Sequence, residues 1–343
     1  MNFSRNKVFS DGLKKSGVRI VECVTTKTGF SKLIDLYKKH KKVKDTYDIL
    51  IAGYPGYTAV PYARLLTRKK VILDALASRY DSEIISRNNH KGSYIKKMWI
   101  LFIDWIAFAF AHLILVETHA QKEFISRKFK ISEKKIIVAY TGVNEDVFKK
   151  DVSISKHEKF TALFRGRVMS EAGVQTILKA AEILKDKDAN FDIIGYGSGP
   201  WLQECRDMYH RLDHNKVKWD EKELPFEEIV IRMQKAHISL GQFATSERVE
   251  RTIPHKAFES MILCTPYITA QSRAVSEILE DGTACIMIDA ENPQALAEAI
   301  MDLRNNESKR NMLATQAETA YWQHYSMEKI GSKLKSDIEE LIK

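Results

Sequence analysis

Short apolar runs alternate with amphipathic helical stretches along nearly the whole chain, and this alternation limits the fold more than any other feature. Such a pattern is typical of parallel strands connected by helices in an α/β protein. In the first half it predicts strands at residues 18–24, 47–52, 70–73, 112–117 and 135–139. In the second half it predicts strands at residues 160–164, 191–194, 217–219, 237–240, 267–269 and 284–288. Each half therefore predicts a Rossmann-type sheet of its own.

The length of 343 residues fits two domains better than one, because a single hydrophobic core rarely serves a chain of this size. A polar stretch at residues 149–158 separates two strand patterns. We predict an N-terminal domain over residues 1–152 and a C-terminal domain over residues 153–325.

The net charge of +9 is unevenly distributed. Residues 1–150 hold 29 Lys and Arg against 14 Asp and Glu, whereas residues 151–343 hold 25 against 31. A basic first half suggests an anionic partner, such as a membrane surface, a phosphorylated lipid or a nucleic acid. No nucleic-acid-binding motif is recognisable, so we expect no nucleic-acid partner.

The four cysteines lack paired spacing and the N-terminus lacks a signal-peptide pattern, which predicts a cytoplasmic protein.

The most apolar stretch, residues 98–116, has nearly the length of a membrane span. Asp104 and His112 lie inside it, and a mid-span carboxylate is costly. We predict instead a buried helix that leads into the strand at 112–117. Because Lys96, Lys97 and Trp99 begin this stretch, its start could touch a membrane interface on the inner face of the cytoplasmic membrane.

Two stretches of the second half place glycines and a cation after predicted strands. In FRGRVMSEAGV, the strand would deliver Gly166 and Arg167 to the carboxyl edge of the sheet, where α/β proteins bind ligands. In IIGYGSGP, Gly195 and Gly197 would let a ligand approach the backbone. The spacing is not the GxGxxG fingerprint of dinucleotide binding, so a nicotinamide enzyme is disfavoured. The alternatives without a ligand are that Arg167 is only an ion-pair partner at the surface and that the glycine stretch is only a tight turn.

A third stretch, RTIPHKAFESM, can supply both ends of a nucleotide-diphosphate site. Pro254 suits the first turn of a helix, whose amides and dipole attract a diphosphate. Lys256 adds a full positive charge there, and Glu259, three residues on, could accept hydrogen bonds from ribose hydroxyls. An ordinary amphipathic helix with a Lys–Glu pair is the alternative.

Together these stretches resemble a GT-B glycosyltransferase of the family 4 type. The resemblance includes FRGRVMSEAGVQTILKAAEIL, DIIGYGSGP and IPHKAFESMILCTPYITAQSRAVSEIL, in the expected order. It extends to the first half through GYPG, VILDALAS, LILVETHAQKEF and VAYTGVNEDVF. The resemblance implies two Rossmann-like α/β domains facing across a cleft, with a C-terminal helix at 326–343 packing back toward the first domain.

The resemblance also implies a retaining transfer from a nucleotide-diphosphate sugar to a saccharide or lipid-linked acceptor of cell-surface glycan synthesis. Fixed cations would oppose the charge that builds on the leaving diphosphate. The implied donor set is Gly166, Arg167, Gly195, Gly197, Arg251, His255, Lys256 and Glu259. No cofactor is expected besides this donor substrate, and no metal, since the only DxD-like string, at 186–188, lies in a polar loop.

Two departures from the family pattern affect the donor side. The lysine usual before the glycine of the first motif is Ala172 here, and the acidic residue usual eight positions before the ribose glutamate, with seven residues between the two, is Arg251. Our hypothesis is that Arg251, assisted by Arg248, replaces the missing cation. The departures also leave open an inactive, donor-binding partner subunit of a glycosyltransferase complex. A homo-oligomer is a further open alternative, independent of these departures.

On the acceptor side, candidates follow strands of the first half. Asp74 is expected at a strand end and, with Arg167 and Lys256, in the catalytic set; Tyr54 and Gly56 follow the preceding strand. His119 stands at a predicted helix start, where a capping or surface role is the alternative. The opening strand usual in the family is not apparent before the helix predicted at 7–16, so we expect a first domain that is less stable or covered by another chain or by the C-terminal helix.

Overall fold

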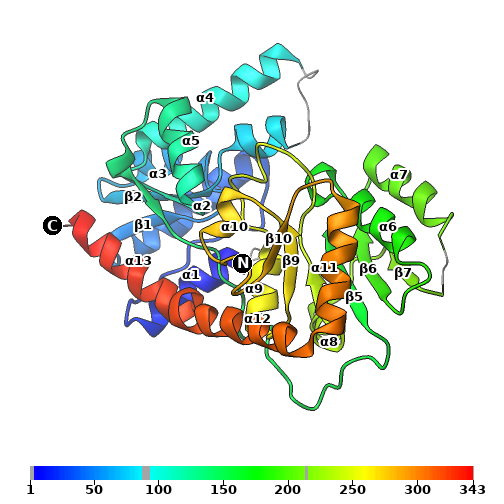
Figure 1. The fold of residues 1–343 in the computed structure, drawn as a ribbon. Helices are drawn as coiled ribbons and strands as arrows, with labels where there is room; N and C mark the ends of the chain where they lie inside the picture. The colour runs from blue at the N-terminus through cyan, green and yellow to red at the C-terminus, as the bar shows by residue number, and fades with distance from the viewer. Residues whose placement is uncertain (1–3, 87–92, 213–214, 343) are drawn as a thin grey trace. The chain divides into compact units, whose positions relative to one another are not determined.

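The structure is a computed structural model that describes residues 4–86, 93–212 and 215–342 (Figure 1). The chain divides into two compact units. Unit 1 comprises residues 1–141 together with 327–343, and unit 2 comprises residues 142–326. Each unit contains one sheet whose strands all run parallel.

The sheet of unit 1 has the order β1-β2-β3-β4, with β1 at Ile49–Ala52, β2 at Lys70–Leu76, β3 at Leu113–Val116 and β4 at Ile136–Val138. Its central strands are buried on both faces, which explains their continuous apolar runs. Its helices are α1 (Ser4–Lys15), α2 (Gly29–Val43), α3 (Ala59–Leu66), α4 (Tyr94–Phe110), α5 (His119–Phe129) and α13 (Met327–Ile342), with a π-helix at Asp81–Ile85 and a 3₁₀ turn at Glu133–Lys135.

Different helices pack on the two faces of this sheet. Val71 and Leu73 point into a core shared with α3, α4 and α5, whereas Ile72 and Leu115 point into a core shared with α1 and α13. Helices α1 and α13 approach so closely that a Cβ on Gly12 or on Gly331 would collide with the backbone of the other helix. The last helix of the chain is therefore part of unit 1.

One predicted strand is wrong. Residues 18–28 form neither a helix nor a strand, and Val21 and Val24 are exposed. Only Val18 and Ile20 pack against the core beside α1, so the apolar pattern reflects partial packing and not a sheet position. In the described part of unit 1, the first strand is β1, at one edge of the sheet.

The stretch at 98–116 forms most of α4 and then β3, so a helix leading into a strand is confirmed. The helix is not wholly buried, however. Ile100, Asp104, Ala107 and Phe108 face the core, while the opposite side is exposed. Within the described ranges, no helix is both long and apolar enough to cross a membrane.

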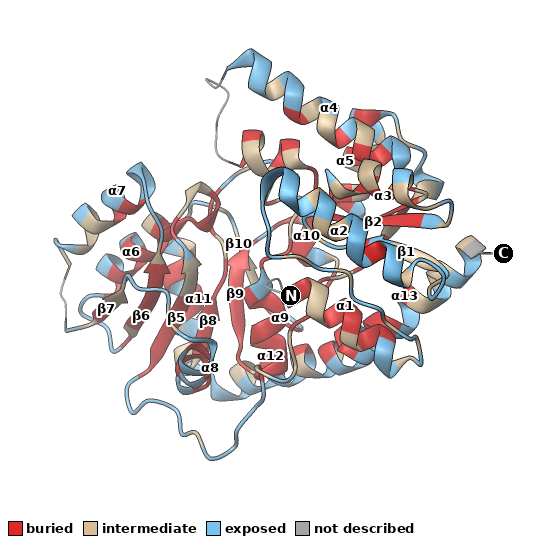
Figure 2. Ribbon diagram, turned by 180° about the vertical axis from the view of Figure 1, so that it is seen from behind, coloured by how far each residue is buried: buried red, intermediate tan, exposed pale blue. Residues whose placement is uncertain are grey.

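The sheet of unit 2 has the order β10-β9-β8-β5-β6-β7. Its strands are β5 (Thr161–Arg167), β6 (Asn190–Tyr196), β7 (Val217–Asp220), β8 (Ile238–Leu240), β9 (Tyr267–Ala270) and β10 (Ile286–Ile288). Its helices are α6 (Val174–Ile183), α7 (Pro200–Tyr209), α8 (Phe226–Lys235), α9 (His255–Ile262), α10 (Arg273–Ser276), α11 (Pro293–Asn305) and α12 (Glu307–Ala320), with 3₁₀ and π turns at Ser170–Ala172 and Tyr321–Tyr325. Figure 2 shows the strands β5, β6, β8 and β9 buried between these helices.

The strand order of unit 2 reverses direction at β5, since β6 lies on one side of it and β8 on the other. Ligands of open α/β sheets bind outside the carboxyl ends of the strands at such a switch point. The carboxyl end of β5 carries Gly166 and Arg167, next to Gly195 of β6.

Candidate donor site

The carboxyl ends of β5 and β6 place two of the predicted glycines side by side. Gly166 pairs in register with Gly195, and Arg167 pairs with Tyr196. A Cβ on Gly166 would lie 3.4 Å from the Nζ of Lys256, so the absence of a side chain there leaves space beside that ammonium group. The packing around Gly195 explains why a glycine stands there. Its carbonyl accepts a 2.8 Å hydrogen bond from Trp219 Nε1, and a Cβ would crowd that ring. Gly197 follows at a φ of 155°, against the backbone of Val168.

Lys256, in the first turn of α9, is buried, with 7% of its surface exposed. Its Nζ lies 3.3 Å from the carbonyl oxygen of Gly241 and 3.8 Å from the ring centroid of Phe164. Among the described residues, no carboxylate lies within ion-pair distance of this ammonium group. Burial, followed by the charge of Arg165, holds the pKa of Lys256 well below its usual range. An ammonium group so placed is stabilised by an anion that enters beside it.

Glu259, one turn further along α9, is held by an arginine that the sequence interpretation missed. Arg165 Nε donates to Glu259 Oε2 at 2.8 Å, and Arg165 Nη2 donates to Glu259 Oε1. Both side chains are largely buried, and this burial lowers the pKa of Arg165 to about 10. The signal available in the sequence was a charge directly after an apolar run, two positions before Arg167. The bidentate pair fixes the carboxylate where ribose hydroxyls were expected.

The remaining cations of the donor motifs stand at the surface or near carboxylates. Arg167 and His255 are exposed. Arg251 Nη2 lies 3.5 Å from Glu247 Oε2 in the same turn, and Arg248 Nε lies 3.8 Å from Glu171 Oε1.

Ala172, at the position of the missing lysine, is packed into the core of unit 2 with 2% of its surface exposed. Its carbonyl accepts a hydrogen bond from the backbone of Phe243 at 3.2 Å. Glu171, its neighbour in the chain, is the residue that faces Arg248. Arg248, which the sequence interpretation gave only an assisting role, is therefore a cation that contacts the residue next to Ala172.

In unit 1, Asp74 lies inside β2 and not at its end, because the strand continues to Leu76. It is 1% exposed, and its carboxylate receives Arg5 Nε at 2.9 and 3.1 Å. Arg5 Nη1 donates to the carbonyl of Ala139 at 2.8 Å and to Thr141 Oγ1 at 3.0 Å, and Thr141 in turn donates to Glu117. Burial raises the pKa of Asp74, and the Arg5 guanidinium opposes that rise.

The other acceptor-side candidates are dispersed. The backbone of Tyr54 exchanges two hydrogen bonds with the side-chain amide of Asn6, at 2.8 and 3.0 Å. Gly56 forms the turn before α3, and its carbonyl accepts from the amide of Ala59 at 2.9 Å. His119 is exposed at the start of α5, whose first turn is capped by the neighbouring Thr118.

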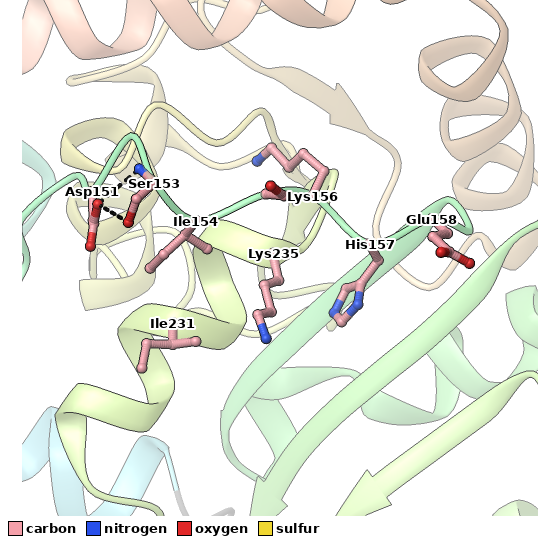
Figure 3. A pocket seen from close by; sticks show the side chains of 9 residues that line it. Asp151, Ser153, Ile154, Lys156, His157, Glu158, Ile231 and Lys235 are labelled. Atoms are coloured by element: carbon pink, nitrogen blue, oxygen red, sulfur yellow. Dashed lines mark hydrogen bonds between the residues drawn. The ribbon is translucent and has the colours of Figure 1, made fainter.

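A depression of about 640 Å³ lies elsewhere in unit 2 (Figure 3). It is lined by the segment Asp151–Glu158 together with Ile231 and Lys235 of α8. These residues precede β5 and β8, so they stand at the amino ends of the strands, whereas the donor motifs stand at the carboxyl ends. Burial lowers the pKa of Lys156 to about 8, and its Nζ donates to the carbonyl of Ala236 at 2.8 Å. The depression shares no residue with the candidate donor site.

The order of the motifs and the fold together define a class of protein. Residues 144–320 match the sequence profile of the family described as glycosyl transferases group 1, which is more than half of the chain. The chain therefore belongs to this family of retaining, nucleotide-sugar-dependent glycosyltransferases with the GT-B fold.

Individual relatives agree with this family. An uncharacterized glycosyltransferase of Methanocaldococcus jannaschii is 25% identical over 320 residues, which cover 91% of this chain and 82% of the relative. A D-inositol 3-phosphate glycosyltransferase of Paenarthrobacter aurescens is 24% identical over 226 residues, covering 61% of this chain and 54% of the relative.

Solved structures share the fold at low sequence identity. Anabaena HepE in complex with UDP-glucose superimposes with a TM-score of 0.71 at 17% identity, covering 96% of this chain and 88% of that one. Sucrose-phosphate synthase from Thermosynechococcus elongatus reaches 0.69 at 13% identity, covering 93% and 80%. The predicted GT-B fold of two parallel α/β sheets is confirmed.

Proposed function

We propose that this glycosyltransferase moves a sugar from a nucleotide-diphosphate sugar to a saccharide or lipid-linked acceptor during the synthesis of a cell-surface glycan. The observation that carries the donor assignment is the buried ammonium group of Lys256, beside Gly166 and without a carboxylate partner among the described residues. A diphosphate supplies the negative charge that this position lacks.

The roles of the donor residues follow from their placement. Lys256 and Arg167 oppose the charge that develops on the leaving diphosphate, which lowers the barrier electrostatically. Glu259 accepts the ribose hydroxyls in an orientation that Arg165 fixes. The backbone at Gly195 and Gly197 lies along the nucleotide, and His255 and Arg251 border the phosphate end of α9.

We assign the acceptor to unit 1 and the donor to unit 2. Tyr54, Gly56 and His119 stay candidates for acceptor contact. We assign Asp74 a positioning role, because its carboxylate binds Arg5, which also binds Ala139 and Thr141. In this proposal the acceptor is bound at the inner face of the cytoplasmic membrane, because an anionic membrane surface attracts the basic unit 1.

A thermal-shift screen with UDP, GDP, dTDP and their sugars tests the donor assignment, and UDP-glucose is the first ligand to try because HepE binds it. A donor at 100 times its dissociation constant stabilises a protein by about 2.7 kcal/mol. The purified chain should also hydrolyse or transfer the sugar of the donor that shifts its melting temperature. If no nucleotide sugar changes the melting temperature, the donor site is wrongly assigned. Binding without turnover would instead favour an inactive partner subunit.

A further inference from the structure

Helix α4 of unit 1 is apolar on two opposite sides, and only one of them is used by the fold. The inner side packs into the core through Ile100, Ala107 and Phe108. The outer side carries seven large apolar residues that are each 46% to 79% exposed: Tyr94, Ile95, Met98, Trp99, Phe102, Trp105 and Phe110. Figure 1 shows α4 at the rim of its unit, and Figure 2 shows its exposed side.

The outer side is a continuous stripe. Residues 95, 98, 99, 102, 105, 106 and 109 are spaced by three and four, which places them on one face of a helix. No charged residue occurs among them. We call this set, with Tyr94 and Phe110 at its ends, the α4 stripe. A contiguous exposed apolar surface of this kind marks a place of interaction.

Polar anchoring on the inner side fixes how α4 can lie. Asp104 is buried there and accepts backbone hydrogen bonds from Arg79 at 3.2 Å and from Tyr80 at 2.8 Å. These bonds tie the helix to the start of the π-helix in its own unit. The 17 residues of α4 therefore lie along the surface of unit 1, with the stripe outward.

Basic residues flank both ends of the α4 stripe. Lys96 is exposed in the first turn, and Lys97 and Lys128 lie 5.7 and 4.8 Å from the ring centroid of Tyr80. At the other end, Lys135 Nζ donates to the carbonyl of Ala109 at 2.8 Å, and the charge of Arg64 acts on Lys135. Tryptophan and tyrosine next to lysine are suited to the headgroup region of a bilayer.

The net charge of unit 1 favours an anionic surface as the partner of the α4 stripe. Unit 1 contains 31 Lys and Arg against 16 Asp and Glu, a net charge of +15, whereas unit 2 has a net charge of −6. Two copies that met through the α4 stripe would bring two such units together, and like charges oppose that contact. An anionic surface is attracted instead.

We propose that the α4 stripe docks unit 1 on an anionic lipid bilayer, with Trp99, Phe102 and Trp105 entering the interface and the flanking lysines binding lipid phosphates. The proposal rests on the proposed function only in that a membrane-bound acceptor explains why a glycosyltransferase would dock. It adds the surface, its orientation and the residues that insert.

The test is sedimentation of the full chain with vesicles of phosphatidylcholine alone and of phosphatidylcholine mixed with phosphatidylglycerol. We expect binding to the mixed vesicles, weakened by salt, and little to the neutral ones. Trp99→Ser combined with Phe102→Ser should weaken binding by about tenfold or more, because two aromatic side chains no longer leave water. Lys96→Glu should weaken it by about fivefold or more.

Trp322→Ser in unit 2 is the matched control, since Trp322 is 48% exposed and contacts a neighbouring aromatic ring, as Trp99 does. The control should bind vesicles like the unchanged chain. Equal binding by the double variant, or no preference for the anionic vesicles, would overturn the proposal. So would a lipid-free dimer that the double variant abolishes, because the stripe would then bind a second copy.

Donor binding separates this proposal from the proposed function. The double variant changes only exposed positions of unit 1, so its melting temperature and its thermal shift with a nucleotide sugar should equal those of the unchanged chain. Failure of every variant and of the unchanged chain to bind a nucleotide sugar would count against the donor site and not against docking.

Discussion

Both units bury charged residues beside their parallel sheets, but the surroundings of these charges differ. In unit 2, the buried Lys256 has a carbonyl and an aromatic face as neighbours, and Gly166 leaves space beside it. In unit 1, the buried Asp74 is matched by Arg5, which also binds Ala139 and Thr141. In unit 1 the paired charges join α1 to the sheet, whereas in unit 2 Lys256 has no carboxylate partner among the described residues.

This difference teaches how to separate a binding residue from a structural one when both are charged and buried. A buried charge that is already paired contributes to the fold, and its loss leaves the partner uncompensated. A buried charge without a counter-ion is costly until a ligand arrives. The first kind should change stability when it is removed, and the second should change binding and turnover.

The largest expected effect belongs to the paired charges of unit 1. Arg5→Met should lower the free energy of unfolding by about 3 to 5 kcal/mol, because it leaves the carboxylate of Asp74 buried and unpaired. Urea unfolding followed by circular dichroism measures this loss. The double variant Arg5→Met, Asp74→Leu should recover part of it, since both charges are then gone. A loss below about 1 kcal/mol in the single variant would end the contrast between the two units.

The candidate donor site should respond in the opposite way. Lys256→Ala and Glu259→Ala should each lower kcat/KM by about ten- to hundredfold, which corresponds to the 1.5 to 3 kcal/mol of a charge-assisted contact. Glu259→Ala should in addition lower the free energy of unfolding, because it leaves Arg165 buried and unpaired. Lys256→Met should unfold no earlier than the unchanged chain, because it removes a buried charge and keeps an apolar stem. Lys185→Ala, at an exposed position of unit 2, is the control for both assays. Unchanged kinetics in Lys256→Ala would remove the donor assignment.

The third prediction concerns the pH dependence that the buried Asp104 of unit 1 gives to the free energy of unfolding. Burial raises the pKa of Asp104 to about 7, against about 3.9 in an unfolded chain. The folded protein therefore holds a proton between these values that the unfolded chain has lost. The contribution of Asp104 to the free energy of unfolding should be fully present below about pH 4. It should decrease as the pH rises to about 7, by at most about 1.4 kcal/mol per pH unit.

Asp104→Asn is the variant that exposes this dependence. Its free energy of unfolding, measured in urea across the same pH range, should lack the decline that the unchanged chain shows. Parallel profiles for the two proteins would mean that Asp104 does not titrate in this window.

The sequence predicted most of the fold because both sheets are parallel and buried, so their strands read as apolar runs between helices. It failed at residues 18–24, where alternate residues pack against α1 without joining a sheet. Of the candidate donor site, the glycines and the residues of α9 were proposed from their spacing. Arg165 was not, because a local pattern does not tell that a charge on β5 meets Glu259 on a helix 94 positions away.

For the same reason the sequence could not show that Asp74 is paired. Its partner, Arg5, lies 69 positions away on α1, in a segment whose composition resembles an ordinary basic helix. Burial and pairing decide whether a charge serves the fold or a ligand, and both come from tertiary contacts.

The smallest expected effect concerns the cation that the family pattern places at Ala172. Because Ala172 is packed in the core, Ala172→Lys should not restore a phosphate contact and should lower the melting temperature. Arg248 lies 3.8 Å from the neighbouring Glu171, so its charge is beside this segment. Arg248→Ala should therefore weaken donor binding more than Arg251→Ala, by about three- to tenfold against less than threefold, in the range of a partly exposed charged contact. Isothermal titration with the donor found in the screen measures both, with Arg304→Ala, whose partner is Asp188, as the control. If Arg251→Ala has the larger effect, the compensating cation is Arg251, and if neither variant changes the affinity, the chain binds its donor without replacing that charge.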